Sequence, residues 1–196
     1  MMTLIMYTVN GGIPMKVSRE QVVENRRRIL DAAAQLFRER GFENVTVAEV
    51  MSAAGLTHGG FYGHFDSKEA LINAAMAHEQ PARRGRPPLE EAARYADSYL
   101  SRQHRDNIGG SCPFSSLGTE VARGSPEVRH TLTESLRRWI DTFSTASEGA
   151  TPQEHRQNAI AAVSAMVGGM VLARLVDDNP LSEEILAAVR ASLPLK

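Results

Sequence analysis

The sequence predicts an all-α protein, and three observations support this. Apolar residues recur at helical spacing along most of the chain, and no run of alternating β-branched residues indicates a strand. Proline follows a capping residue at Ser125 and at Thr151, which is a signal for the start of a helix. Hydrophobic residues make up 42% and charged residues 23% of the 196 residues, as in ordinary globular proteins. About nine helices are expected.

The most informative stretch is TVAEVMSAAGLTHGGFYGHFDSKEAL, residues 46–71. It starts with a capping box of Thr46 and Glu49, followed by apolar residues at helical spacing. Gly55 then gives the backbone the freedom to leave this helix, and Thr57 is placed to cap a second short helix over 58–65. A helix, a glycine turn and a second helix make the geometry of a DNA-binding helix-turn-helix, here residues 46–65.

The second of these helices contains three glycines, Gly59, Gly60 and Gly63. Each costs about 1 kcal/mol relative to alanine in a helix interior, so helix propensity alone favours a loop. One interpretation is that the missing side chains let the backbone approach the major groove, while Tyr62 and His64 bind phosphates or base edges. The alternative is a plain glycine-rich turn after the first helix.

The residues that follow favour the first interpretation. Asp66-Ser67 caps a further helix, and Lys68 in its first turn can reach a phosphate near the helix amides. From Gly55 to Glu69 the chain closely matches the pattern of the TetR/AcrR family of bacterial transcriptional regulators. The resemblance is specific over 21–79 and only suggestive beyond. His58 departs from the pattern, because the family usually has Lys or Arg there. Pattern and resemblance together predict DNA contacts by Thr46, Thr57, His58, Gly59, Gly60, Tyr62, His64 and Lys68.

The chain divides by composition into four parts. Residues 1–14 are expected to be a disordered or loosely attached extension, and 15–80 a DNA-binding domain that begins with a helix from about Arg19 to Arg40. A helix from Ser67 to about Gln80 ends this domain. The run PARRGRPP marks a linker, 81–88, before a C-terminal helical domain, 89–196.

Charge and cysteine content limit the class of protein. The net charge is −1, but residues 15–86 carry 11 Lys/Arg against 9 Asp/Glu, so the small basic excess lies where DNA binding is expected. A single cysteine excludes an internal disulfide and fits a reducing cytoplasm. The sequence lacks a phosphate-binding loop, a nucleophile elbow and a histidine pair at i, i+4, so no enzyme, cofactor or metal site is predicted.

The C-terminal domain is expected to contain helices over about 89–102, from Pro113, from Pro126 through Phe143, and from Pro152 onward. The uncharged run 159–173 is shorter than the ~20 residues that span a bilayer, which favours a core helix over a membrane helix. Ser182 is predicted to cap the last helix. The resemblance implies that two C-terminal helices of each copy form a four-helix dimer interface; residues assigned to it are Ser164, Gly168, Gly169, Ile185 and Val189.

The resemblance also implies a pocket for a small-molecule inducer inside this domain. Aromatic and apolar side chains are its expected lining, with simple core packing as the alternative for each: Tyr95, Tyr99, Phe114, Trp139, Phe143 and Met166. Cys112 precedes Pro113, so it is expected near a helix N-terminus, where a thiol can become reactive. A buried, inert cysteine is the alternative.

The function expected from these features is a ligand-responsive homodimeric repressor, released from operator DNA by a small-molecule inducer. One alternative is a regulator that responds to electrophiles or oxidants through Cys112. Others are an activator or a family member that does not bind DNA.

Overall fold

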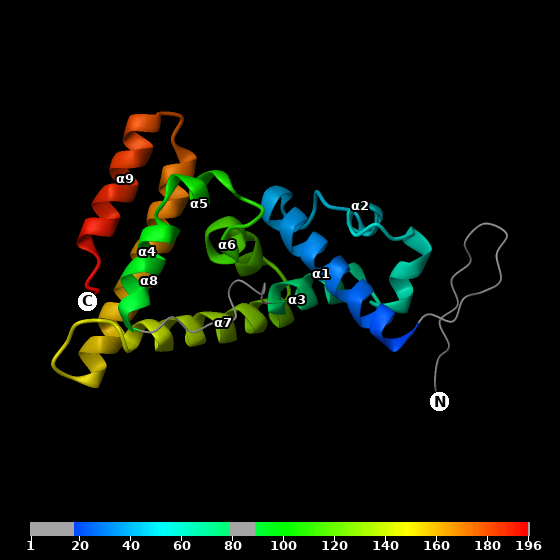
Figure 1. Cartoon of the computed structure of the whole chain (residues 1–196), viewed down its shortest axis with the longest axis horizontal. Coiled ribbons are helices and arrows are strands. Elements are labelled where there is room, and N and C mark those ends of the chain that lie inside the picture. The colour runs from blue at the N-terminus through cyan, green and yellow to red at the C-terminus, as the bar shows by residue number, and fades with distance from the viewer. Residues whose placement is uncertain (1–17, 79–88, 196) are drawn as a thin grey trace. The chain divides into compact units, whose positions relative to one another are not determined.

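The structure is a computed structural model that describes residues 18–78 and 89–195. The expected extension 1–14 and the linker 81–88 lie outside these residues. The chain forms two compact units, Met1–His78 and Glu79–Lys196. Figure 1 shows the helices of both units. An isolated bridge between Ser147 and Leu195 is the extent of β structure among the described residues, so the all-α prediction is confirmed.

The N-terminal unit is a small helical domain built on its first helix. Its elements are α1 (Arg19–Arg40), α2 (Val47–Ala53), the 3-10 helix η1 (His58–Gly63) and α3 (Lys68–Ala77). α1 packs against α2 and α3, and α2 packs against η1 (Figure 1). Large side chains with almost no exposure fill the space between them: Ile29, Phe37, Val45, Val50, Met51, Phe61 and Leu71. Burying each such side chain contributes about 1.5–3 kcal/mol.

The turn after α2 depends on a glycine. Gly55 has a φ of +67°, a conformation that side chains with a Cβ rarely adopt. A Cβ built there would lie 2.5 Å from Nη2 at the flexible end of the Arg28 side chain, which could shift, so it is the positive φ that favours glycine here. The turn therefore has the form that the sequence predicts.

α2 begins with the predicted capping box. The Thr46 backbone N–H and hydroxyl both donate to Oε2 of Glu49, at 2.8 and 2.7 Å, and the Glu49 N–H donates to Oγ1 of Thr46 at 3.2 Å. Arg40 pairs with the other carboxylate oxygen at 2.8 Å. These contacts join the end of α1 to the start of α2.

Acid should weaken this junction. The hydrogen bonds from the backbone and hydroxyl of Thr46, and then Arg40, lower the pKa of Glu49 from its ordinary value of 4.5 to about 2. A lowered pKa stabilises the fold above pH 4.5, and that stabilisation is lost as the pH falls from about 4.5 towards 2. Glu49→Gln should therefore unfold with a weaker dependence on pH across this window. Denaturant midpoints at pH 7 and pH 3 test this, and equal pH dependence of both proteins contradicts it.

The second helix of the motif differs from the expectation of an α-helix over 58–65. It is a 3-10 helix that ends at Gly63, with the Gly60 N–H donating to the Thr57 carbonyl and the His64 N–H to the Phe61 carbonyl. Gly59, Gly60 and Gly63 have low α-helix propensity. The segment therefore forms the i to i+3 hydrogen bonds of a 3-10 helix, which is wound more tightly than an α-helix.

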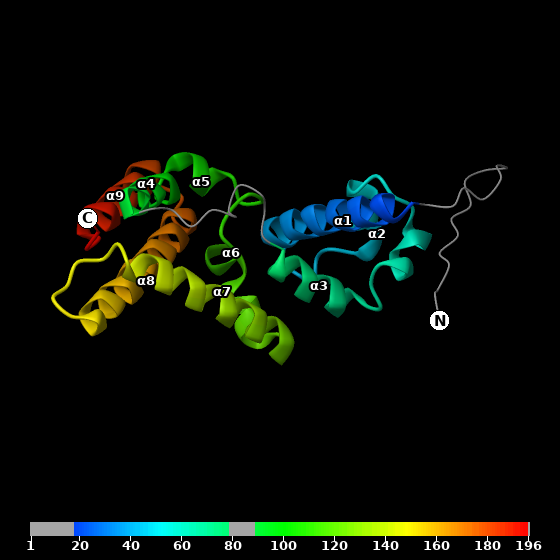
Figure 2. The same ribbon diagram turned by 60° about the horizontal axis from the view of Figure 1, so that its bottom comes forward.

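The C-terminal unit is a bundle around one long helix. Its elements are α4 (Leu89–Tyr99), α5 (Arg102–Asp106), α6 (Pro113–Arg123), α7 (Pro126–Ser144), α8 (Pro152–Leu175) and α9 (Asn179–Ser192). α8 packs against α5, α6, α7 and α9, and Figures 1 and 2 both show it between α7 and α9. A second capping box, of Thr151 and Glu154, begins α8 as predicted.

Two boundaries in this unit differ from the sequence prediction. The helix expected over 89–102 ends at Tyr99, because Ser101 caps a new helix by accepting from the His104 N–H at 3.2 Å. The last helix begins at Asn179, where the Asp178 carboxylate accepts from the Leu181 N–H. Ser182 therefore lies inside α9. Its buried hydroxyl donates to the Ala173 carbonyl at 2.6 Å and joins α9 to α8.

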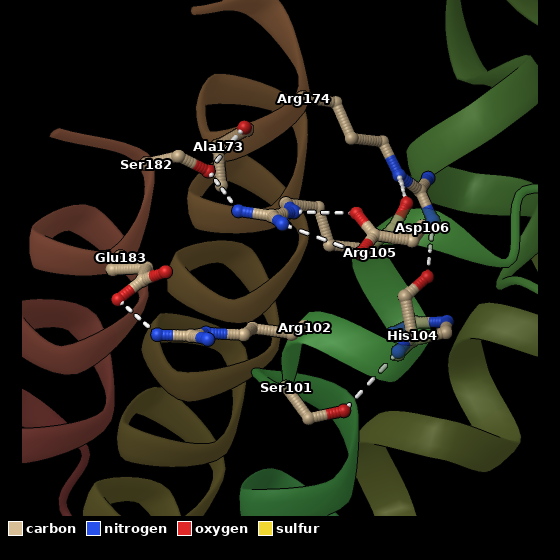
Figure 3. Close-up of polar contacts among 9 residues, drawn as sticks. All are labelled: Ser101, Arg102, His104, Arg105, Asp106, Ala173, Arg174, Ser182 and Glu183. Atoms are coloured by element: carbon tan, nitrogen blue, oxygen red, sulfur yellow. Dashed lines mark hydrogen bonds and ion pairs between the residues drawn. The ribbon is translucent and has the colours of Figure 1, made fainter. Parts of the chain in front are cut away.

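A polar cluster holds the short helix α5 against α8 and α9 (Figure 3). Arg174 at the end of α8 donates to the carbonyls of His104 at 2.8 Å and Arg105 at 3.0 Å. Arg105 donates to Ser182 at 2.9 Å, and Arg102 pairs with Glu183. Burial lowers the pKa of the half-buried Arg174. The guanidinium thus binds carbonyls that the end of α5 leaves without helical partners.

Candidate nucleic-acid interface and ligand site

Two buried phenylalanines fix the position of η1. Phe61 and Phe65 are 1% and 4% exposed, and their rings stack at a centroid distance of 5.8 Å. Tyr62 lies between them in sequence but is 71% exposed, with its ring edge-on to Phe61 at 5.2 Å. The short helix is therefore anchored on its inner side and presents an aromatic hydroxyl to solvent on its outer side.

Arg26 of α1 holds the end of η1 in place. Its Nη1 donates to the His64 carbonyl at 2.6 Å, and its guanidinium carbon lies 4.2 Å from the centre of the Phe65 ring. This contact between residues far apart in sequence is not visible in the sequence pattern, which shows only three consecutive arginines. The next arginine, Arg27, pairs with Glu24 and Asp31 on its own helix.

His64 is partly buried beside Arg26. Burial, and then the positive charge of Arg26, lowers the pKa of His64 from its ordinary value. The neutral ring is therefore favoured at physiological pH, and it can offer a hydrogen bond to DNA but not a positive charge.

The other predicted contact residues differ in what they can offer DNA. Thr57, His58 and Gly59 are exposed at the start of η1, and Lys68 is half-exposed in the first turn of α3. The Thr46 hydroxyl is exposed, but its proton is donated to Glu49. Gly60 is buried, so its packing in the domain is one reason for a small residue there.

Lys68 lies at a helix end suited to an anion. Ser67 caps α3 by accepting from the Ala70 N–H at 3.0 Å. The first amides of a helix and its dipole favour negative charge, so a phosphate there would meet both the amides and Lys68.

Comparison with known proteins identifies the family. The family model described as "Bacterial regulatory proteins, tetR family" matches residues 29–75, and the one described as "Tetracyclin repressor-like, C-terminal domain" matches residues 88–189. The chain belongs to the TetR family of bacterial transcriptional regulators.

Relatives of this TetR-family chain are named regulators. A stretch of 51 residues is 48% identical to the transcriptional repressor KstR2 of Rhodococcus jostii, over 26% of this chain and 25% of that protein. A longer match, 27% identical over 124 residues, is to the repressor DhaR of a Mycobacterium species, over 60% of this chain and 63% of that protein. These matches thus cover only part of each relative's length.

Solved structures show the same fold. The reduced form of Escherichia coli NemR has a TM-score of 0.69 at 22% identity, covering 86% of this chain and 95% of NemR. A TetR-family regulator from Cytophaga hutchinsonii also has a TM-score of 0.69, at 18% identity, covering 90% of this chain and 98% of that chain. At this level of identity the similarity concerns the fold.

The side chains predicted to line an inducer pocket lie together in the core of the C-terminal unit. Trp139 is the centre of an aromatic group, with Tyr95, Tyr99, Phe114 and Phe143 at centroid distances of 5.7–6.2 Å. Met166 is fully buried in the same core. A pocket of about 410 Å³ lies beside this group, between α6 and α7, and Phe114 is the member of the predicted set that lines it.

Cys112 is the N-cap residue of α6, as predicted, but it is only 4% exposed. Its backbone N–H donates to Nε2 of His104 at 3.2 Å, while Nδ1 of the same ring contacts the Tyr99 carbonyl at 2.6 Å. The imidazole thus connects α4 to the start of α6. The proposed reactivity of Cys112 stays a prediction, and its burial does not favour it.

The predicted dimer residues lie on different faces of α8 and α9. Ser164 and Gly168 are exposed, and a Cβ built on Gly168 would meet nothing within 4 Å. Gly169 is buried, and a Cβ there would lie 2.9 Å from Cγ2 of Val189. Ile185 and Val189 pack against the core of their own subunit. Gly169 and Val189 therefore make close contact between α8 and α9 within one chain.

The exposed face of α8 is largely apolar. Ile160, Val171, Leu172 and Leu175 are 42%, 42%, 51% and 76% exposed. At about 100° per residue these side chains, with Ser164 and Gly168, lie within one third of the helix circumference, opposite the buried residues.

Among the described residues, α8 is also the one helix that is long and apolar enough to cross a membrane. In its most apolar stretch of 18 residues, however, 39% is buried inside the protein.

A metal site was not predicted. Within 18–78 and 89–195, no group of three or more His, Cys, Asp or Glu side chains could hold a metal ion.

Proposed function

We propose that this chain is a cytoplasmic homodimeric repressor that binds operator DNA and is released by a small-molecule inducer. The observation that carries the proposal is the exposed Tyr62 on a short helix anchored by Phe61, Phe65 and Arg26. Such an element can enter a major groove without deforming, because its inner side is fixed to the domain.

The dimer is proposed on the apolar face of α8. A two-fold dimer presents two helix-turn-helix units to half-sites about 34–36 Å apart. An exposed stripe of apolar residues with a glycine at its middle suits close packing of a second copy, because burying that stripe removes apolar surface from water. An inducer would favour a conformation of the dimer whose two units no longer match adjacent grooves.

The direct test is a gel shift with the DNA upstream of the protein's own gene. A shifted band that a competitor of unrelated sequence does not remove supports the proposal. Binding that is equally weak to all sequences contradicts it, and indicates a family member that has lost operator recognition.

Tyr62→Ala should weaken operator binding about tenfold, because it removes a contact from the exposed side of η1 while leaving Phe61 and Phe65 buried. Fluorescence anisotropy with labelled operator measures the effect. Tyr62→Phe is the matched control, since it separates the hydroxyl from the ring. If Tyr62→Ala binds operator with wild-type affinity, this side of η1 does not contact DNA.

His58→Arg should strengthen operator binding and steepen its dependence on salt. His58 is exposed at the first position of η1, where an arginine can reach a phosphate. One added phosphate contact changes the slope of log K against log salt by about 0.9. Titrations at several salt concentrations measure this slope, and an unchanged slope would show that position 58 faces a base edge or solvent.

A further inference from the structure

The pocket between α6 and α7 is formed by one face of each helix. On α6 it is lined by Phe114, Gly118 and Val121, and on α7 by Leu132 and Leu136. Residues three or four positions apart lie on the same side of a helix. The pocket is therefore a groove with two largely apolar walls, and its volume of about 410 Å³ lies in the range of small-molecule sites.

The groove has a direction and a length. α6 ends at Arg123 and α7 begins at Pro126, so the two helices are joined at one end of the groove. Arg129 lines this end, and Phe114 and Leu136 line the other. At about 1.5 Å per residue, the wall from Arg129 to Leu136 is roughly 10 Å long. An extended chain of roughly eight carbons, with bonds of about 1.5 Å, has this length.

Arg129 is the charged residue of the groove. Its Nη2 donates to the Gly124 carbonyl at 3.4 Å, which is long for a hydrogen bond. Within 18–78 and 89–195, no carboxylate forms an ion pair with it. Thr133 is the other polar side chain of the lining, but its hydroxyl donates to the Arg129 carbonyl at 2.8 Å. The guanidinium is therefore the group of this groove that is best suited to bind an anion.

We propose that the groove binds a linear aliphatic carboxylate of about eight carbons, the length that matches its walls. The carboxylate accepts two parallel hydrogen bonds from the guanidinium of Arg129, a geometry that the two planar groups share. The chain lies between α6 and α7 and points towards Phe114 and Leu136, which removes apolar surface from water. This inference rests on the proposed inducible regulator and names its ligand class.

Octanoate and octan-1-ol form a matched pair of probes, because they share a chain length and differ in charge. Calorimetry on the full chain, without DNA, should show octanoate binding about tenfold more tightly, the effect of one charge-assisted hydrogen bond pair. Octylamine should bind more weakly than either, since it brings a second positive charge to Arg129. Equal affinities for octanoate and octan-1-ol, or no binding of octanoate, would overturn the proposal.

The length of the groove gives a second test. From butanoate to octanoate the affinity should rise about two- to fourfold with each added methylene, because each one buries more apolar surface. It should then level off by dodecanoate, whose chain extends past the end of the walls. An affinity that keeps rising through dodecanoate would indicate adsorption to apolar surface in general and would overturn the proposed groove.

Arg129→Met should reduce the affinity for octanoate to that for octan-1-ol and leave octan-1-ol binding unchanged, because the apolar stem stays and the charge is lost. Arg129 is exposed, so the subunit should remain folded. Arg123→Met is the matched control. Arg123 is an exposed arginine at the end of α6, outside the pocket lining, and its loss should change neither affinity. If Arg129→Met still prefers octanoate about tenfold, Arg129 does not hold the carboxylate and the proposal fails.

Gly118→Leu should abolish binding of both probes. A Cβ at Gly118 meets nothing within 4 Å, so the leucine fills the groove without touching the core. Thr119→Leu, at the exposed neighbouring position, is the control and should bind both probes normally. Unchanged binding by Gly118→Leu would overturn the groove as the site.

Release of operator DNA by octanoate is measured separately, so that failure of this site and failure of the proposed function can be told apart. Octanoate that binds as described while operator stays bound supports the site and contradicts induction through it. Octanoate that releases operator equally from the wild type and from Arg129→Met would overturn the proposal.

Discussion

Gly168→Leu should convert the protein from a dimer to a monomer while each subunit remains folded. A Cβ at this position meets nothing within 4 Å in the subunit, so the leucine does not disturb its own core. In the proposed dimer the same side chain would separate two helices that pack closely at a glycine. Analytical ultracentrifugation and circular dichroism measure the two effects.

Operator binding should fall roughly a hundredfold or more in the same variant, because a monomer brings only one helix-turn-helix and half of the phosphate contacts. Gly118→Leu is the matched control, since Gly118 is also an exposed helical glycine with open space around it, and it should remain dimeric. Gly169→Leu should instead destabilise the subunit, because its side chain would meet Val189. A Gly168→Leu protein that sediments as a dimer would place the interface elsewhere.

Arg174→Met should lower the free energy of unfolding by about 2–4 kcal/mol. The methionine keeps much of the apolar stem but removes the groups that bind the His104 and Arg105 carbonyls and, at 3.3 Å, the Ser115 hydroxyl. A fully buried acceptor left unpaired costs about 1–3 kcal/mol, and these partly buried acceptors should each cost towards the lower end of that range. Urea unfolding at one fixed protein concentration measures the change.

The control for Arg174→Met is Arg137→Met. Arg137 is 62% exposed and pairs with Glu134 one turn away, so its loss should change stability by less than about 1 kcal/mol. Equal small losses in both variants would show that the cluster in Figure 3 contributes little to holding α5. A large loss in Arg174→Met alone would confirm that the end of α8 stabilises α5.

Features with a local signal could be predicted from the sequence. The bounds of α1, the capping boxes at Thr46 and Thr151, and the turn at Gly55 all agree with the structure. Each depends on residues within one or two helical turns, whose hydrogen bonds and φ preferences are properties of those residues themselves.

Features that depend on contacts between distant segments could not be predicted. Asp178 rather than Ser182 caps α9, because the Ser182 hydroxyl is used to join α9 to α8. Gly168 and Gly169 are adjacent in the sequence, yet one is exposed and the other meets Val189. Arg174 shows in the sequence only as the charge that ends an apolar run.

The features of the candidate sites also fall into two groups, those that the sequence identifies and those that only the packed structure shows. The sequence alone identifies the helix-turn-helix stretch and the aromatic residues of the second unit, because their types and spacing are local. Only the packed structure shows that Arg26 fixes η1, that Cys112 is buried, and that the Tyr99 hydroxyl and Nε1 of Trp139 are buried. Burial and hydrogen-bond pairing are set by which helices meet, and a sequence pattern does not contain that information.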